Sequence, residues 1–259
     1  MGMPVTTGTY IIWFSAAALE VVVLFRGVRM GLARTYPFFY VYLACIFLSE
    51  LLRFFCYEFA PSLYQAFYWH IELVLIVTSY AILVDVFRQA LKYSPGVLRK
   101  GQKLLLIVFV VAASYAFADL LHVGFAYWPW ATANVGRYLR NVEGAVLLAM
   151  LWLFGRYRVS FRRNLLGLTI GYSLVVGLDV SNLAFWFERR GWSSVLLPKL
   201  HSIIYVITLG IWCISLWSPQ SEAAAPAESA IERDYAILAC KTRTALGTLS
   251  ARVARTLRP

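Results

Sequence analysis

The feature that most constrains this chain is a series of long apolar runs separated by short polar connections. An α-helix needs about 20 mostly apolar residues to cross a bilayer core of about 30 Å. Because backbone polar groups in lipid must be paired within the protein, such runs fold as helices. Seven runs meet this requirement, at residues 8–26, 36–56, 65–87, 104–123, 134–154, 165–187 and 195–217. We therefore predict an all-α bundle of seven transmembrane helices over residues 1–217.

The composition favours membrane spans over a large soluble core. Apolar residues make up 61% of the 259-residue chain and charged residues only 14%, whereas soluble domains contain about 25% charged residues. The net charge of +11 comes from Lys and Arg in short connections, so we do not expect nucleic-acid binding. The four cysteines form no CxxC pair, and we expect no structural disulfide.

The distribution of basic residues predicts the orientation in the membrane. The connections after the first, third and fifth runs are rich in Arg and Lys, while the alternate connections are poor in them. The basic residues of the first group are Arg26, Arg29, Arg34, Arg88, Lys92, Arg99, Lys100, Lys103, Arg156, Arg158, Arg162 and Arg163. Because cytoplasmic loops carry the excess of positive charge, we predict a cytoplasmic C-terminus and an N-terminus on the outer side.

The composition changes abruptly after Trp217. Residues 218–229 are rich in Ala, Pro, Ser and Glu, which is typical of a flexible linker. Residues 230–259 place apolar side chains at helical spacing among Lys and Arg. We predict a basic amphipathic helix in the cytoplasm that lies on the anionic membrane surface. Docking of this helix on a cytoplasmic partner is the alternative.

Charged residues within the apolar runs indicate where a functional site would lie. A charged side chain at the centre of a span costs roughly 2.5–3.5 kcal/mol on insertion scales, so it usually faces the bundle interior. The inner half of the predicted bundle holds only Glu20 and Asp85, the latter beside Arg88, whereas six of the seven runs carry charges in the outer half. This asymmetry predicts a polar chamber that opens outward. The candidate ligand-binding residues are His70, Glu72, Arg137, Arg140, Glu143 and Asp179.

Spacing within the runs predicts local contacts. Glu50 and Arg53 are three residues apart, as are Arg140 and Glu143, so each pair shares a helix face and can form an ion pair. Gly167 and Gly171 form a small-xxx-small pair that permits close contact between helices.

Metal and cofactor chemistry is weakly supported by the sequence. Candidate metal ligands, of residue types that zinc accepts, are His70, Asp119, His122 and His201. The chain has no HExxH motif, and its last run has a single histidine. His70 and His201 could also be axial heme ligands, but two isolated histidines are a weak pattern. We predict no cofactor and no catalytic residue.

Three short runs of residues resemble a family of bacterial seven-span membrane proteins that has no assigned function. They are Tyr36-Pro-Phe-Phe-Tyr40, Tyr68-Trp-His-Ile-Glu72 and Val86-Phe-Arg-Gln-Ala-Leu-Lys-Tyr-Ser-Pro95. The resemblance implies a seven-helix fold and a location in the bacterial inner membrane, and it implies no catalytic activity.

The leading hypothesis is a membrane protein of receptor or sensor type. It would bind a small polar or anionic ligand in the outer-half chamber and signal to a cytoplasmic or membrane partner through its loops and tail. One alternative is a membrane enzyme, possibly metal-dependent, that acts on a lipid or polyprenyl substrate at the outer leaflet. Another is a structural subunit of a membrane complex. The absence of a strong catalytic motif favours the non-enzymatic readings.

Overall fold

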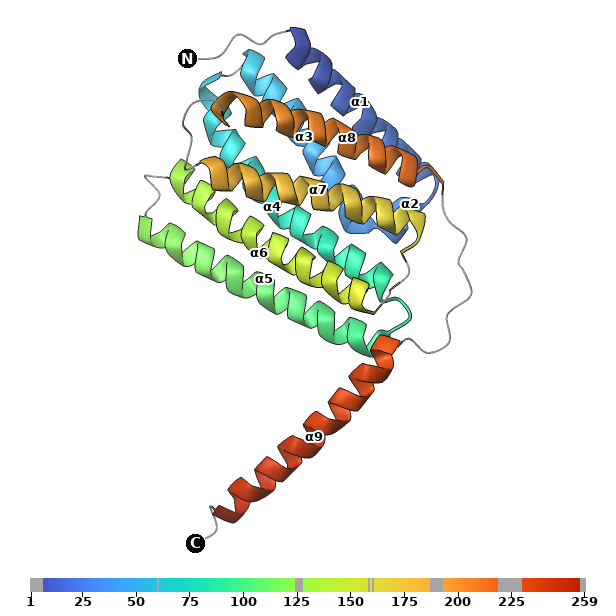
Figure 1. Ribbon diagram of the computed structural model, residues 1–259. Helices are drawn as coiled ribbons and strands as arrows, with labels where there is room; N and C mark the ends of the chain where they lie inside the picture. The colour runs from blue at the N-terminus through green and yellow to red at the C-terminus, as the bar shows by residue number, and fades with distance from the viewer. Residues whose placement is uncertain are drawn as a thin grey trace.

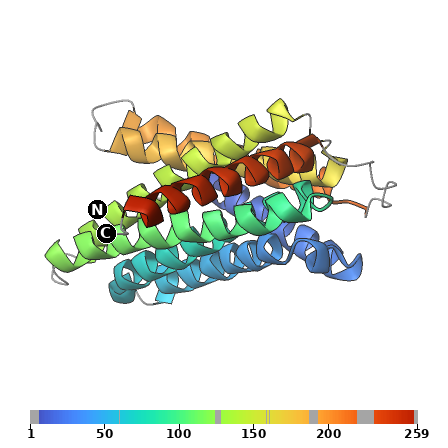
Figure 2. The same ribbon diagram turned by 90° about the horizontal axis from the view of Figure 1, so that it is seen from below.

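The computed structural model describes residues 7–59, 61–123, 128–157, 159, 161–186, 193–218 and 230–256, and these residues fold entirely into helices and short connections. The long helices of the bundle are α1 (Thr7–Arg29), α3 (Pro37–Phe59), α4 (Pro61–Ala90), α5 (Pro95–Val123), α6 (Trp128–Arg156), α7 (Arg163–Trp186) and α8 (Ser193–Ser215). The short α2 (Leu32–Thr35) follows α1, and α9 (Ala230–Thr256) forms the tail. Figures 1 and 2 show the long helices side by side, with α5 at one edge.

Local sequence explains where several helices begin. Pro37, Pro61 and Pro95 are the first residues of α3, α4 and α5. Proline suits this position because its missing N–H would have no partner in the first turn. Between α1 and α2 the chain turns at Gly31, whose φ of 70° lies in the left-handed region that glycine adopts without steric cost.

Among the described residues, five helices are long and apolar enough to cross a membrane. Their apolar segments are Tyr10–Arg29 of α1, Pro37–Cys56 of α3, His70–Ala90 of α4, Pro95–Ala118 of α5 and Arg163–Ser181 of α7. The apolar part of α8 among the described residues is shorter, Leu200–Ser215, and α6 carries Arg137, Arg140 and Glu143. Each of the seven predicted runs lies largely within a long helix, but the spanning role of α6 and α8 and the orientation stay predictions.

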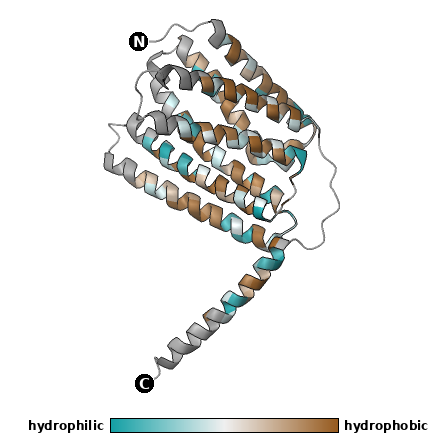
Figure 3. Ribbon diagram, viewed as in Figure 1, coloured by the Kyte–Doolittle hydropathy of each residue, from teal (hydrophilic) through white to brown (hydrophobic). Residues whose placement is uncertain are grey.

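The distribution of side chains is that of an integral membrane protein. Large apolar side chains are exposed along the helices, among them Ile107 and Val111 of α5 and Trp152 of α6. Charged side chains such as Glu20 and Arg140 are buried instead, which is rare in soluble proteins. In Figure 3 the hydrophobic colour runs along most of α5, and hydrophilic residues lie on α6 and at the start of α9.

The packing of α7 against α8 depends on two glycines. A Cβ atom added at Gly167 would overlap the Ser215 side chain, and one added at Gly171 would overlap the indole of Trp212. The close contact predicted from the small-xxx-small pair is therefore confirmed. Around it lies a large apolar core that includes Trp212 and Phe39, whose rings pack edge to face with centroids 4.9 Å apart.

The ends of α1, α4 and α6 and the starts of α3, α5 and α7 lie together. We call this the basic end because 12 of the 18 Arg and Lys residues in 1–217 lie in or beside its connections. Here Asp85 of α4 caps α3. Asp85 Oδ2 accepts hydrogen bonds from the backbone N–H groups of Phe38, at 2.7 Å, and Phe39, at 3.0 Å. Its Oδ1 lies 3.3 Å from Arg88 Nη2. The negative charge suits a helix N-terminus, where backbone N–H groups lack partners.

A second carboxylate caps α5 in the same way, and it comes from the tail. Glu232 of α9 accepts hydrogen bonds from the backbone N–H groups of Gly96, at 3.0 Å, and Val97, at 3.3 Å. The preceding residue, Ile231, is buried against the bundle core. From this anchor α9 extends away from the bundle and across the direction of α5 (Figure 1). Figure 2 shows α9 from below, in front of the bundle. The predicted linker, 219–229, lies outside the described residues.

Candidate functional site

A buried polar cluster joins four helices of the bundle, and Arg140 of α6 is at its centre. Its Nη1 lies 3.2 Å from Glu143 Oε2 and donates a hydrogen bond of 3.0 Å to Ser79 Oγ of α4. Its Nη2 lies 3.1 Å from Asp179 Oδ2 of α7. The side chain is only 6% exposed. A guanidinium suits this position because it stays charged when buried and its fork can serve two carboxylates at once.

Glu143 is the most buried charged member of the cluster, with 1% of its side chain exposed. One of its oxygens pairs with Arg140, as the spacing of the two residues predicts. The other accepts a hydrogen bond from the Tyr172 hydroxyl of α7. That hydroxyl also lies 2.6 Å from the Ser79 carbonyl oxygen. Both carboxylate oxygens are thus satisfied, which a buried charge requires.

Asp179 extends the cluster to α8. Its Oδ2 pairs with Arg140 and its Oδ1 lies 3.2 Å from His201 Nε2. Asp179 is 18% exposed and His201 is 40% exposed. Exposure therefore increases from Glu143 through Asp179 to His201, so the cluster is reached from its α7–α8 side.

A second ion pair lies beside the cluster. Arg53 Nη2 of α3 is 3.2 Å from Glu72 Oε2 of α4, and the Arg53 guanidinium lies over the Tyr68 ring at 4.7 Å from its centroid. Glu72 interacts electrostatically with Arg140 and His201. The predicted pairing of Arg53 with Glu50 is wrong, because the partner with the better geometry comes from the neighbouring helix.

The structure thus brings together some of the sequence-predicted residues and separates others. Arg140, Glu143 and Asp179 form one cluster, with Glu72 next to it. Arg137 is half-buried and lies over the Tyr138 ring, 5.3 Å from its centroid. His70 is exposed.

The structure describes the side chains of only some of the candidate metal ligands. His201 pairs with Asp179, and the side chains of Asp119 and His122 lie outside the described residues. Among the side chains that are described, no three His, Cys, Asp or Glu residues are grouped as metal ligands would be.

Two residues of the cluster, Tyr172 and Ser79, were not predicted from the sequence. Tyr172 is seven residues from Asp179, and Ser79 is seven residues from Glu72. Seven residues are two helical turns, so each pair shares a face. This spacing is the pattern in the sequence that could have indicated both residues. No pattern in the sequence indicates the contact between Asp179 and His201, because that contact depends on how α7 and α8 are placed.

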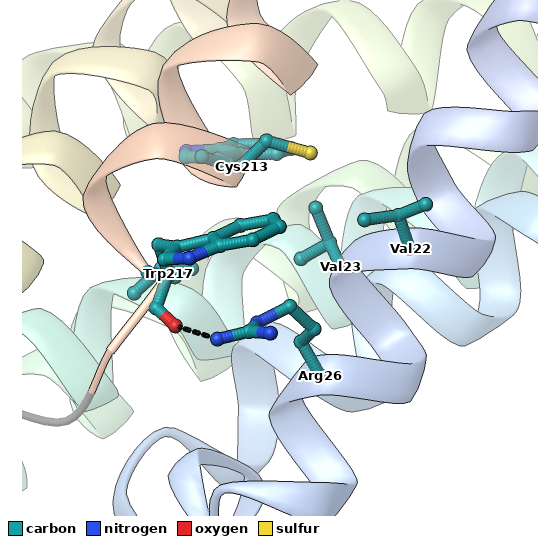
Figure 4. Close-up of a pocket in the computed structure, with 7 residues that line it drawn as sticks. Val22, Val23, Arg26, Cys213 and Trp217 are labelled. Carbon is teal, nitrogen blue, oxygen red and sulfur yellow. Dashed lines mark hydrogen bonds between the residues drawn. The ribbon is translucent and has the colours of Figure 1, made fainter.

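A separate hollow lies between α1 and α8 at the basic end (Figure 4). The Arg26 guanidinium lies 3.8 Å from the centroid of the Trp217 ring, and its Nη2 donates a 2.6 Å hydrogen bond to the Trp217 carbonyl oxygen. Apart from Arg26, its lining is apolar or weakly polar, including Val23 and Cys213. The contact holds the end of α8 against α1, away from the polar cluster.

No protein-family model, curated protein or solved structure matches this chain. The resemblance to the bacterial seven-span family therefore stays a prediction, and the functional argument depends on the geometry of the cluster.

Proposed function

We propose that this chain is a multi-pass membrane protein of receptor or sensor type whose polar cluster binds a small polar or anionic ligand. In this proposal α6 and α8 also cross the membrane, which gives seven spans. The basic end faces the cytoplasm of a bacterial cell, and the N-terminus lies outside the inner membrane. The seven long helices packed side by side and the concentration of Arg and Lys at one end support this arrangement.

The observation that carries the proposal is the position of Arg140 between two carboxylates from different helices. The Arg140–Asp179 pair ties α6 to α7, and the Asp179–His201 pair ties α7 to α8. A carboxylate or phosphate group of a ligand offers the guanidinium an anionic oxygen acceptor of the kind that Asp179 Oδ2 provides. The partial exposure of Asp179 and His201 makes this the side of the cluster from which a ligand can compete.

Displacement of Asp179 supplies a response to binding. Once the ligand holds Arg140, α6 and α7 lose their ion pair, and Asp179 keeps only His201. A ligand shifts such an equilibrium only by the difference between its affinities for the two arrangements. The competing carboxylate supplies that difference, because the ligand and Asp179 cannot hold the same guanidinium nitrogen together.

The tail is proposed to lie on the cytoplasmic membrane surface, from which it or the loops contact a partner. It begins at the basic end and runs across the direction of α5, as a helix in the membrane plane would. Exposed Ile237, Leu238 and Leu246 occur with exposed Lys241 and Arg243. Exposed apolar and basic residues together are typical of helices at anionic bilayer surfaces.

Thermal unfolding of the purified protein with a panel of small carboxylates and with inorganic phosphate tests the ligand proposal. An anion that binds at roughly 100 times its Kd stabilises the folded protein by about 2.7 kcal/mol. We expect Asp179→Asn to bind the same anion more tightly, because the competing charge is gone. Arg140→Lys should bind it more weakly, because the fork is lost.

The exposed Arg99 supplies the matched control, since Arg99→Lys should leave the anion-induced shift unchanged. An equal shift in wild type and Arg140→Lys would place anion binding elsewhere on the protein. A panel in which no anion stabilises either wild type or Asp179→Asn would contradict the anionic-ligand proposal.

A further inference from the structure

A second buried polar site lies between α1, α3 and α8, outside the Arg140 cluster. Glu20 of α1 is fully buried, with 0% exposure, within the apolar segment Tyr10–Arg29. Its Oε1 accepts a hydrogen bond from the Tyr205 hydroxyl of α8. Its Oε2 is buried and has no hydrogen-bond partner among the described residues. A buried carboxylate oxygen without a donor is costly, so this atom needs an explanation.

The neighbouring carboxyl group is Glu50 of α3. It interacts electrostatically with Glu20, and its own Oε2 is likewise buried without a hydrogen-bond partner among the described residues. Arg53, the cation nearest to Glu50 along α3, interacts electrostatically with Glu50, but its ion pair is with Glu72. Two acids on neighbouring helices, α1 and α3, therefore interact electrostatically, and each has one buried oxygen without a hydrogen-bond partner among the described residues.

The other polar groups around α1 do not compensate Glu20. From α8, Cys213 makes a 3.9 Å contact with the Leu19 carbonyl oxygen. From α3, the Tyr40 ring lies against Gly27, nearer the basic end. Arg34 of α2 is exposed at that end, and Arg26 of α1 is held by Trp217. The described groups that act on Glu20 electrostatically are Glu50 and Tyr205, and neither carries positive charge.

We propose that Glu20 and Glu50 form a proton-binding site between α1, α3 and α8, with Tyr205 orienting Glu20. Protonation removes one of two like charges from an apolar interior, where a single uncompensated charge is already costly. It also converts Glu20 Oε2 from an acceptor without a donor into a donor, and Glu50 offers an unsatisfied acceptor. The two acids therefore hold one proton between them and titrate as a pair.

The position of Tyr42 connects this site to the Arg140 cluster. Tyr42 of α3 is buried and interacts electrostatically with Arg140, Glu143 and Asp179. It also interacts with Tyr205. The phenol thus lies within electrostatic range of both sites, although the proton site does not depend on ligand binding at Arg140.

Infrared spectroscopy of the purified protein at neutral pH tests the proposal. A protonated carboxyl group has a C=O stretch separate from the bands of a carboxylate, and this stretch shifts in D2O. We expect such a band in wild type and its loss in Glu20→Gln, which keeps the shape of the neutral acid. Asp234→Asn is the control and should retain the band, because Asp234 is an exposed acid of α9.

Two further variants probe the roles of the neighbours. Glu50→Gln removes the adjacent negative charge, so the band should disappear at a lower pH than in wild type. Tyr205→Phe removes the hydrogen bond to Glu20, so the frequency of the band should change while the band itself remains. Both readouts report on Glu20 in the folded protein and do not depend on stability alone.

Three results would overturn the proposal. The first is the absence of the band in wild type at neutral pH, because both acids would then be ionised. The second is persistence of the full band in Glu20→Gln. The third is loss of the band when choline chloride is replaced by NaCl, because a metal cation would then occupy the pair in place of the proton.

Discussion

Acids at the basic end and acids in the polar cluster are buried to a similar extent but have different partners. Asp85 is 0% exposed and Glu143 is 1% exposed. Asp85 accepts hydrogen bonds from two backbone N–H groups of α3, whereas Glu143 and Asp179 are held by side chains. A backbone partner cannot be exchanged without opening the first turn of a helix. A side-chain partner can be replaced by a ligand group or a proton. The burial of a charge therefore does not identify a functional site. The kind of group with which the buried charge is paired does.

Replacement of Arg140 should produce the largest effect, since it leaves Glu143 and Asp179 without their shared cation. We expect Arg140→Met to reduce the free energy of unfolding by about 3–5 kcal/mol, the usual cost of breaking a buried ion pair from one side. Thermal or denaturant unfolding in detergent measures the change. Arg99→Met, the same substitution at an exposed position, should have little effect.

The triple variant Arg140→Met, Glu143→Gln and Asp179→Asn distinguishes the loss of the ion pairs from the cost of leaving buried carboxylates unpaired. It should recover most of the stability that Arg140→Met loses, because no buried charge is left uncompensated. A triple variant as unstable as the single one would show that the cluster is needed for packing, and the contrast with the basic end would then disappear.

Removal of the Asp85 cap should also reduce the free energy of unfolding, but by less than Arg140→Met does. Loss of a capping side chain typically costs about 0.5–2 kcal/mol, and Asp85→Ala leaves the N–H groups of Phe38 and Phe39 without their acceptor. Asp85→Asn keeps one acceptor oxygen and should cost less. Hydrogen exchange at these two amides, measured beside unfolding, locates the change. Because Asp85 shares no hydrogen-bond or ion-pair partner with Arg140 among the described residues, neither variant should alter anion binding; an altered affinity would place Asp85 in the functional site.

The positions of the helices and of some local pairs could be predicted from the sequence, while contacts between helices could not. Apolar runs and their charges require only the order of residues, and the Arg140–Glu143 contact requires only a spacing of three. The Asp179–His201 contact depends on the rotation of α7 and α8. Arg53 shows the same limit, because its partner Glu72 lies on another helix. The outer-half position of charged residues indicated the region of the cluster, but the assignment of partners required the fold.

The tail provides the smallest predicted effect and the sharpest test of what a capping carboxylate does. Glu232 joins α9 to the first turn of α5, so Glu232→Ala should release the start of α9 at a cost of about 0.5–1 kcal/mol. Gly96→Ala should do the same from the opposite side, because a Cβ at Gly96 would overlap the Glu232 carboxylate. Faster proteolysis after residue 230 and faster hydrogen exchange at Val97 should appear in both variants. Both changes should be absent in Asp234→Asn, which changes an exposed acid of the same helix.

The bundle should unfold at its wild-type temperature in Glu232→Ala, Gly96→Ala and Asp234→Asn, because Glu232 holds the tail and not the spans. A fall as large as that of Asp85→Ala would instead make α9 part of the folded core.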